Sequence, residues 1–149
     1  MLALDKLISE VIGGRALTLV MVRNGQSMGN YAGSIVGWTD SKLSIKGREQ
    51  ANKLFGGFYK HVDRFTGVYS SDVLRSMDTA KLALGFPTRK VITDKRLREI
   101  NFGDDEGRHF DSLPPAEKDR INSLEYAAPN GESWKQVKER SQEFYRELK

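Results

Sequence analysis

A run of mostly apolar residues, Leu17 to Val22, ends abruptly at the polar turn Arg23-Asn-Gly25. The run is continuous, partly β-branched and free of charged residues, which is typical of a strand buried on both faces, as in a parallel sheet. Parallel strands need crossover connections, usually helices. This one segment therefore already favours an α/β fold.

Helical and strand-like segments alternate along the rest of the chain. Helices are expected after three good N-cap residues, Ser44, Asp72 and Ser133, because apolar residues recur at helical spacing behind each of them. Phe65–Ser70 and Val91–Ile92 have the length and composition of short strands. The alternation predicts a three-layer α/β/α fold with a mostly parallel central sheet.

The expected organisation is an N-terminal helix over residues 1–14, followed by one domain over residues 15–149. Leu4, Leu7, Ile8 and Val11 lie on one helical face, and Gly13-Gly14 would end that helix.

The chain ends at Lys149, directly behind the last predicted helix and without a Gly, Asn or Pro stop. An α/β chain normally returns to the sheet at such a point. We therefore expect the domain to be incomplete at its C-terminus and truncated before the last core βα unit. The chain would then be a fragment, a shortened form or one half of a two-chain domain.

Composition narrows the choice of ligand. The chain carries 24 Lys and Arg against 20 Asp and Glu, a formal net charge of +4, which suits anionic ligands. The basic residues are scattered and carry no nucleic-acid motif, so nucleic acid is not expected as a partner. Cysteine is absent and the two histidines show no ligand spacing, so neither a metal nor a cofactor is expected.

Hydropathy gives no sign of a membrane or targeting segment. The longest apolar stretch is too short to span a bilayer. The first residues fit neither a signal peptide nor a transit peptide, so a cytoplasmic location is expected.

Polar side chains follow each of the three predicted strands. Arg23 and Asn24 follow the first, Arg75 lies one turn into the helix behind the second, and Glu99 comes after the third. Because ligands of open α/β sheets bind beyond the carboxyl ends of the strands, we expect these side chains to share one pocket. Two arginine forks suit the oxygens of a phosphomonoester or of inorganic phosphate, and a carboxylic acid beside them could protonate a leaving alkoxide.

The residues around this pocket resemble a known family. Val22-Arg-Asn-Gly-Gln-Ser27 with Asn30 is similar to the R-H-G-(E/Q)-(S/T)-x-x-N signature of the histidine phosphatase (phosphoglycerate mutase-like) superfamily. Further blocks of that family follow in the same order: Gly37-Trp-Thr-Asp40, Leu43-Ser44-x-x-Gly47-x-x-Gln50-Ala51, Tyr69-Ser-Ser-Asp72-x-x-Arg75-x-x-x-Thr79-Ala80, Leu97-Arg-Glu99-Ile-Asn-Phe-Gly103-x-x-Glu106-Gly107, and Pro129-Asn-Gly-Glu-Ser133 with Arg140. The form of the block around Glu99 is closer to the broad phosphatase branch than to the glycolytic mutases.

The resemblance implies a two-step phosphoryl transfer through a phosphohistidine. It implies that Arg23 and Arg75 clamp phosphate and that Glu99 is the general acid. Asn30 would contact substrate or phosphate, or else only cap its loop. Residues 110–130 would form the lid that sets substrate specificity.

Two positions depart from the family pattern. Asn24 stands in the place of the nucleophilic histidine, and a second histidine, in a late H-G motif, has no counterpart before Lys149. An amide nitrogen is not nucleophilic, so covalent phosphohistidine chemistry is excluded at position 24. The asparagine could be a natural change or an experimentally introduced one.

Two functions from different classes remain open. In the first, the chain is a phosphatase scaffold that binds a phosphate group but does not turn it over. In the second, it is a natural pseudoenzyme with a structural or interaction role, and another chain, identical or different, covers its open sheet edge.

Overall fold

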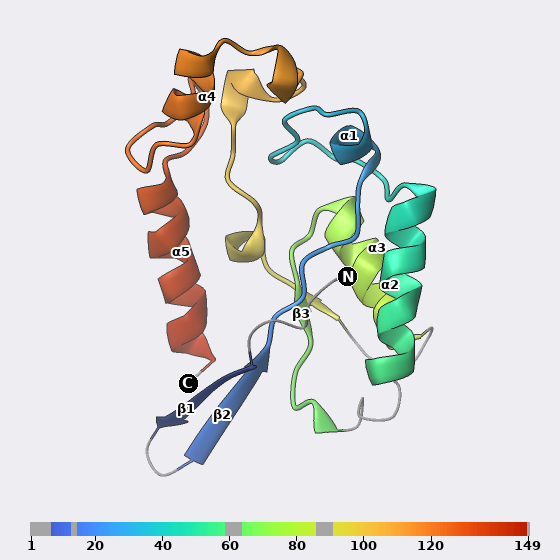
Figure 1. Ribbon diagram of the computed structural model, residues 1–149. Helices are drawn as coiled ribbons and strands as arrows, with labels where there is room; N and C mark the ends of the chain where they lie inside the picture. Colours follow the sequence, from blue (N-terminus) through green and yellow to red (C-terminus); the bar gives the residue numbers. More distant parts are fainter. Residues whose placement is uncertain (1–6, 13–14, 59–63, 86–90, 149) are drawn as a thin grey trace.

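The structure is a computed structural model that describes residues 7–12, 15–58, 64–85 and 91–148. Its helices and strands are, in chain order, β1 (Leu7–Ile12), β2 (Arg15–Val20), α1 (Met28–Tyr31), α2 (Ile45–Phe58), β3 (Tyr69–Ser70), α3 (Leu74–Leu84), β4 (Ile92–Thr93), α4 (Pro115–Ile121) and α5 (Trp134–Glu147). Short 3-10 turns at Lys95–Leu97, Gly103–Asp105 and Phe110–Ser112 interrupt the long connection between β4 and α4 (Figure 1). The chain is therefore α/β, as predicted.

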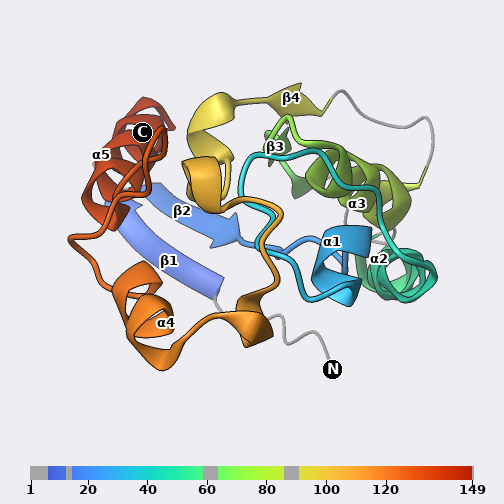
Figure 2. The same ribbon diagram turned by 90° about the horizontal axis from the view of Figure 1, so that it is seen from above.

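The predicted parallel pairing is present in β3 and β4. Tyr69 lies opposite Ile92 and Ser70 opposite Thr93. α2 and α3 pack together on one side of these strands, and α5 lies on the other side (Figure 1 and Figure 2). Within the described residues, however, parallel pairing is confined to these two short strands, so the parallel sheet is much smaller than expected.

The N-terminal segment differs from its prediction. β1 and β2 form an antiparallel pair, from Leu7 opposite Val20 to Ile12 opposite Arg15. The expected helix over residues 1–14 is therefore a strand in Leu7–Ile12, and residues 1–6 and 13–14 lie outside the described part of the chain. The Gly-Gly pair of the sequence favours a two-residue hairpin as well as a helix stop, and the apolar run behind it supplies the strand partner.

The predicted strand Leu17–Val22 ends earlier than expected, and its last two residues are more exposed than expected. β2 ends at Val20, and the next two residues, Met21 and Val22, expose 55% and 42% of their surface. Among the described residues β1 is the one strand that pairs with β2. The burial on both faces that the apolar run predicts is therefore not reached in this part of the chain.

Two of the predicted helix caps are confirmed. The hydroxyl of Ser44 accepts the N–H of Gly47 at 3.0 Å, at the start of α2. The hydroxyl of Ser133 accepts the N–H of Gln136, and the Gln136 side chain accepts the Ser133 N–H at 2.8 Å, a complete capping box on α5.

The third predicted cap, Asp72, is wrong. α3 begins at Leu74, and the Leu74 N–H donates to Oδ1 of Asp40, at 3.0 Å. Asp72 instead forms a bidentate pair with the guanidinium of Arg98, with both N···O distances 2.6 Å. A carboxylate from the loop before α2 thus replaces the local cap, which ties that loop to α3.

The region predicted as a lid forms a small core together with Ile35 and Phe102, which lie outside it. Ile35, Leu113 and Ile121 are buried together, and the half-buried Phe102 and Phe110 pack against them. α4 belongs to this region, so the lid is more regular than its polar sequence indicates. In the described chain, no helix combines the length and the apolar character needed to cross a membrane.

We predict that Asp40→Ala lowers the free energy of unfolding by about 1 kcal/mol, because the Leu74 N–H at the start of α3 loses its acceptor. Urea unfolding followed by circular dichroism measures the change. Asp119→Ala, which removes an exposed carboxylate from α4, serves as the matched control. Equal stability of the two variants would contradict the capping role of Asp40.

Candidate functional site

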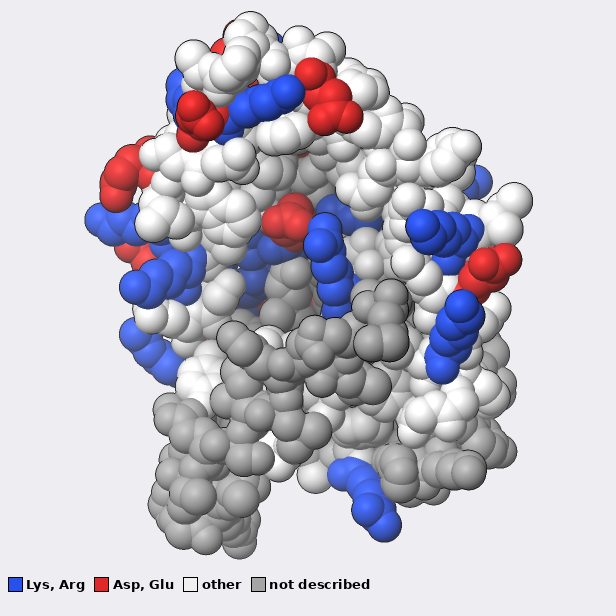
Figure 3. Space-filling view, viewed as in Figure 1, with Lys and Arg blue, Asp and Glu red and all other residues white. Residues whose placement is uncertain are grey.

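A cavity of about 240 Å³ lies between the segment that follows β2 and the lid. All five residues predicted for the site line it: Arg23, Asn24, Asn30, Arg75 and Glu99. Figure 3 shows this face of the molecule hollowed at its centre, where basic and acidic side chains lie together with uncharged side chains above them. The structure therefore brings the sequence-predicted residues to one place.

Close packing fixes the backbone next to Asn24. A Cβ atom on Gly25 would lie 2.4 Å from the carbonyl oxygen of Gly47, and one on Gly47 would lie 2.0 Å from the carbonyl oxygen of Gln26. The two glycines thus let this segment lie directly on the first turn of α2. The Gly25 N–H donates to Oγ1 of Thr79 in α3, at 3.1 Å. Two helices therefore position the turn after β2.

The two asparagines of the site have different local partners. Nδ2 of Asn24 donates to the carbonyl oxygen of Gly25 at 2.8 Å. Oδ1 of Asn30 accepts the N–H of Ser27 at 3.3 Å and its hydroxyl at 2.9 Å, and the Asn30 N–H donates back to that hydroxyl at 3.1 Å. Asn30 thus has the loop-capping role considered from sequence, at the edge of the cavity.

Arg75 is almost fully buried, with 4% of its surface exposed. Its Nη2 donates to the carbonyl oxygen of Gly37 at 2.6 Å, and its Nη1 donates to that of Thr39 at 3.2 Å. Burial lowers the pKa of the Arg75 guanidinium, and the carboxylates of Glu99 and Asp40 oppose this effect. Arginine stays protonated in proteins, so the cavity contains one buried, fixed positive charge.

The loop that Arg75 holds is also held from its other side by Glu106. The carboxylate of Glu106 accepts the N–H groups of Trp38 at 2.6 Å, Thr39 at 2.7 Å and Phe102 at 3.2 Å, and it also accepts the Thr39 hydroxyl. Gly37 has a φ of +50°, and a Cβ atom there would lie 2.0 Å from Oε1 of Glu106. Glycine is therefore required at position 37, and one arginine and one glutamate fix the shape of the loop.

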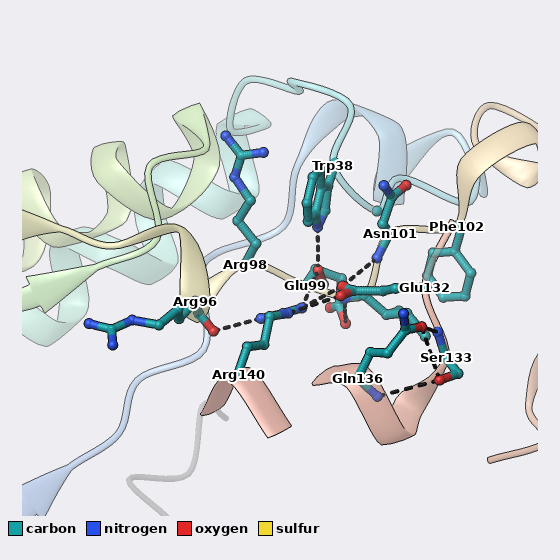
Figure 4. A network of polar contacts seen from close by, with 12 residues as sticks. Trp38, Arg96, Arg98, Glu99, Asn101, Phe102, Glu132, Ser133, Gln136 and Arg140 are labelled. Atoms are coloured by element: carbon teal, nitrogen blue, oxygen red, sulfur yellow. Dashed lines mark hydrogen bonds and ion pairs between the residues drawn. The ribbon is translucent and has the colours of Figure 1, made fainter. Parts of the chain in front are cut away.

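Glu99 is fixed through its backbone. Its carbonyl oxygen accepts Nε1 of Trp38 at 2.8 Å and Nη2 of Arg140 at 3.0 Å (Figure 4). Nη1 of Arg140 also donates to the carbonyl oxygen of Arg96 at 2.6 Å. The Glu99 carboxylate itself accepts the N–H of Ile100 at 3.1 Å. The segment that carries Glu99 is therefore fastened to α5 and to the loop before α2.

Glu132 completes this network. It pairs with Arg140 at 2.6 Å, and both side chains are largely buried. Oε1 of Glu132 also accepts the N–H of Asn101 at 3.0 Å, and the Glu132 N–H donates to the Asn101 carbonyl at 2.9 Å. Arg140 is therefore a structural ion-pair partner of Glu132, and it does not line the cavity.

Sequence reasoning missed the supporting role of three residues, Trp38, Glu106 and Glu132. Each lies inside a block that carries the family resemblance, which was the signal available. The contacts of Glu106 with Trp38, of Trp38 with Glu99 and of Glu132 with Asn101 span 68, 61 and 31 positions along the chain, so spacing alone could not reveal them.

Comparison with known proteins decides the family. Residues 19–149 match the family model of the histidine phosphatase superfamily (branch 1). The chain belongs to this superfamily. The resemblance drawn from the sequence motifs is therefore confirmed at the level of the superfamily.

Relatives and solved structures of this superfamily agree with the fold. The chain is 36% identical over 136 residues to the fructose-2,6-bisphosphatase TIGAR of Xenopus tropicalis, an alignment that covers 87% of this chain and 49% of the relative. A phosphoglycerate mutase from Thermus thermophilus superposes with a TM-score of 0.68 at 35% identity, covering 83% of this chain and 68% of that structure. Bacillus stearothermophilus YhfR superposes with a TM-score of 0.75 at 30% identity, covering 85% and 64%.

The superfamily relatives are longer than this chain. The chain spans 66%, 49% and 56% of the length of three curated relatives that it matches, or about half to two thirds.

Arg98 stabilises the carboxyl end of β3 in this histidine phosphatase fold. Arg98 forms the bidentate pair with Asp72, and its guanidinium lies 4.6 Å from the centroid of the Trp38 ring. The hydrogen bonds from Arg98 lower the pKa of the Asp72 carboxyl. Both members of the pair are partly exposed, so its contribution to stability is modest.

The lowered pKa of Asp72 predicts a pH dependence of stability. A carboxyl whose pKa is depressed by folding stabilises the folded state above its unfolded pKa, about 4, and loses this contribution as the pH falls through the folded pKa. We expect Asp72→Asn to be less stable than the unmodified chain by about 1 kcal/mol at pH 7. The difference should shrink on acidification below about pH 4.

Urea unfolding at a series of pH values measures this difference. Asp119→Asn, an exposed site on α4, is the control and should follow the unmodified chain at every pH. A stability difference between Asp72→Asn and the unmodified chain that stays constant down to about pH 2 would contradict the assigned ion pair.

Proposed function

We propose that this chain binds the phosphate group of a phosphomonoester, or inorganic phosphate, in the cavity between Arg23 and Arg75. The observation that carries the proposal is that Arg23, Asn24, Asn30, Arg75 and Glu99 all line one cavity. The names of the relatives support a phosphate ligand, since a bisphosphatase and phosphoglycerate mutases are among them.

The two arginines supply complementary parts of a phosphate site. Arg75 is buried and held by two carbonyl oxygens, so its charge is preorganised. Arg23 is exposed, so its side chain has room to close over an anion that has entered. Charge-assisted hydrogen bonds from guanidinium groups to phosphate oxygens are among the stronger polar contacts in proteins. Glu99 borders the same cavity, and in this proposal it is the group that protonates a leaving oxygen.

With Asn24 in the place of the nucleophile, the site can bind a phosphate group without turning it over. The Asn24 side chain borders the cavity, but the lone pair of an amide nitrogen is delocalised into the carbonyl group. It therefore cannot accept a phosphoryl group covalently, and a phosphohistidine cannot form at this position. We propose that the chain acts as a phosphate-binding phosphatase scaffold that is inactive, or strongly impaired, as a phosphomonoesterase.

We predict that isothermal titration calorimetry detects saturable binding of orthophosphate. Arg23→Ala should weaken this binding at least tenfold, because a charge-assisted hydrogen bond contributes about 1.5–3 kcal/mol. The same preparation should release no p-nitrophenol from p-nitrophenyl phosphate above background.

Arg48→Ala is the matched control, because Arg48 is an exposed arginine on α2 that does not line the cavity. Equal effects of Arg23→Ala and Arg48→Ala would show that phosphate is attracted by the net positive charge of the protein, and would contradict the proposed binding site. Ordinary turnover by the unmodified chain would overturn the inactivity. Recovery of turnover in Asn24→His would strengthen the assignment of position 24.

A second candidate function is an interaction role. It is favoured by apolar side chains that stay exposed on and beside the strands: Met21 at 55%, Val22 at 42%, Tyr69 at 40% and Ile92 at 43%. Exposed apolar side chains beside unpaired strand backbone are a common docking surface for another strand. The partner would be a second copy of the chain or a different protein.

This second candidate predicts association in solution. Size-exclusion chromatography with multi-angle light scattering should give a mass above 16.8 kDa at micromolar concentrations. Met21→Lys should shift the equilibrium toward the monomer, because it places a charge among the exposed apolar residues. Lys46→Met, a substitution on the exposed start of α2, is the control. A folded monomer at all concentrations would count against self-association.

A further inference from the structure

The cavity has an apolar side that the proposed phosphate contact does not use. Besides the polar residues, its lining includes five apolar residues: Ile35, Val36, Phe102, Phe110 and Ile121. Four of them belong to the lid cluster around Leu113, in which Ile35 and Ile121 are buried and the two phenylalanines are half-buried. This apolar wall is therefore part of a packed core, and its phenylalanine rings keep surface that a ligand can cover.

The charges at the cavity suffice for one phosphate group. Among the described lining residues the cations are Arg23 and Arg75, and Glu99 is an anion beside them. Arg75 already donates to two carbonyl oxygens, so only part of its hydrogen-bonding capacity is left for a ligand. A second phosphate or a carboxylate on the same ligand would meet Glu99 and no further lining cation in the described part of the chain.

The basic residues in the lid and directly before it do not supply that second anion site. Nζ of Lys118 donates to the carbonyl oxygen of Asp111 at 3.0 Å and lies 5.7 Å from the centroid of the Phe110 ring. Arg108 is paired with Asp105 at 2.6 Å and with Glu117 at 2.5 Å. The guanidinium of Arg120 lies 4.8 Å from the centroid of the Tyr126 ring. None of these three basic residues lines the cavity, and each contacts lid residues instead.

We infer that this site prefers a phosphomonoester with a compact, uncharged and apolar alcohol part, such as an aryl phosphate. Phe102, Phe110 and Ile121 would be the residues that determine this specificity. The inference rests on the proposed phosphate site and adds the class of ligand. Its physical basis is that the ring of the ligand covers apolar surface of the wall. A second anionic group on the ligand would instead be repelled by the Glu99 carboxylate.

Calorimetry on the unmodified chain with four probes tests this inference: orthophosphate, phenyl phosphate, glycerol 3-phosphate and 3-phosphoglycerate. Phenyl phosphate should bind at least fivefold more tightly than glycerol 3-phosphate, and 3-phosphoglycerate should bind no better than glycerol 3-phosphate. Equal affinity for phenyl phosphate and glycerol 3-phosphate, or a preference for 3-phosphoglycerate, would overturn the inference while leaving the phosphate site intact. If orthophosphate and all three esters fail to bind, the proposed function fails, and the inference fails with it.

Substitutions at Phe110 and Asn122 test whether the apolar wall causes the preference for phenyl phosphate. Phe110→Ser should reduce the ratio of the phenyl phosphate and glycerol 3-phosphate affinities, whereas the matched Phe110→Leu should keep it. Asn122→Lys, at an exposed lining position on the lid, should improve binding of 3-phosphoglycerate relative to phenyl phosphate by adding the missing cation. This variant leaves the lid core intact, so it remains informative if Phe110→Ser does not fold. An unchanged preference in Asn122→Lys and in a folded Phe110→Ser would contradict the assigned wall.

Discussion

The buried guanidinium of Arg75 is the interaction on which the cavity depends. It is a positive charge from α3, and two backbone carbonyl oxygens of the loop before α2 hold it in place. Glu106 binds the N–H groups of the same loop, so the loop has a cation on its carbonyl side and an anion on its amide side. A buried charge is costly unless its hydrogen bonds are satisfied. The loop satisfies them for Arg75, and the guanidinium keeps a fixed place in the cavity lining.

The same principle extends to the opposite side of the cavity. The backbone of Glu99 is held in place because its carbonyl oxygen accepts hydrogen bonds from the side chains of Trp38 and of Arg140 in α5. Arg140 is in turn held by Glu132, whose backbone and side chain both bind Asn101. Arg140 of the last helix thus helps to position Glu99, whose carboxylate would act on a leaving group. Local distortion in α5 should therefore reach the site even though Arg140 and Glu132 do not line the cavity.

The sequence allowed the superfamily to be predicted, and it also allowed the gathering of the candidate residues around one cavity to be predicted, because these residues lie within short motifs. Arg23 and Arg75 were expected in one pocket because both follow strands of a single predicted sheet. They do line one cavity, although β2 and β3 lie in separate sheets within the described residues. Long-range contacts could not be predicted in the same way. Asp72 looked like the cap of α3, yet Asp40 takes that role because Asp72 is bound by Arg98.

The apolar pattern of the N-terminal segment was compatible with two structures. Leu7 to Ile12 has helical spacing, but the Gly-Gly pair behind it and the apolar run that follows allow the antiparallel pair seen in the structure. The prediction that the strand after that turn is buried on both faces was wrong for a related reason. Burial on both faces requires neighbours on both sides, and periodicity in one strand does not reveal whether those neighbours are present.

Nuclear magnetic resonance titration with orthophosphate tests the central claim most directly, since it locates the anion without depending on turnover. The side-chain amide signals of Asn24 and Asn30 and the Nε signal of Arg75 should move together and yield one dissociation constant. The amide signals of exposed residues on α5, such as Lys138, should not move. Shifts spread over surface lysines, or no shift at Asn24 and Arg75 at saturating phosphate, would contradict the account.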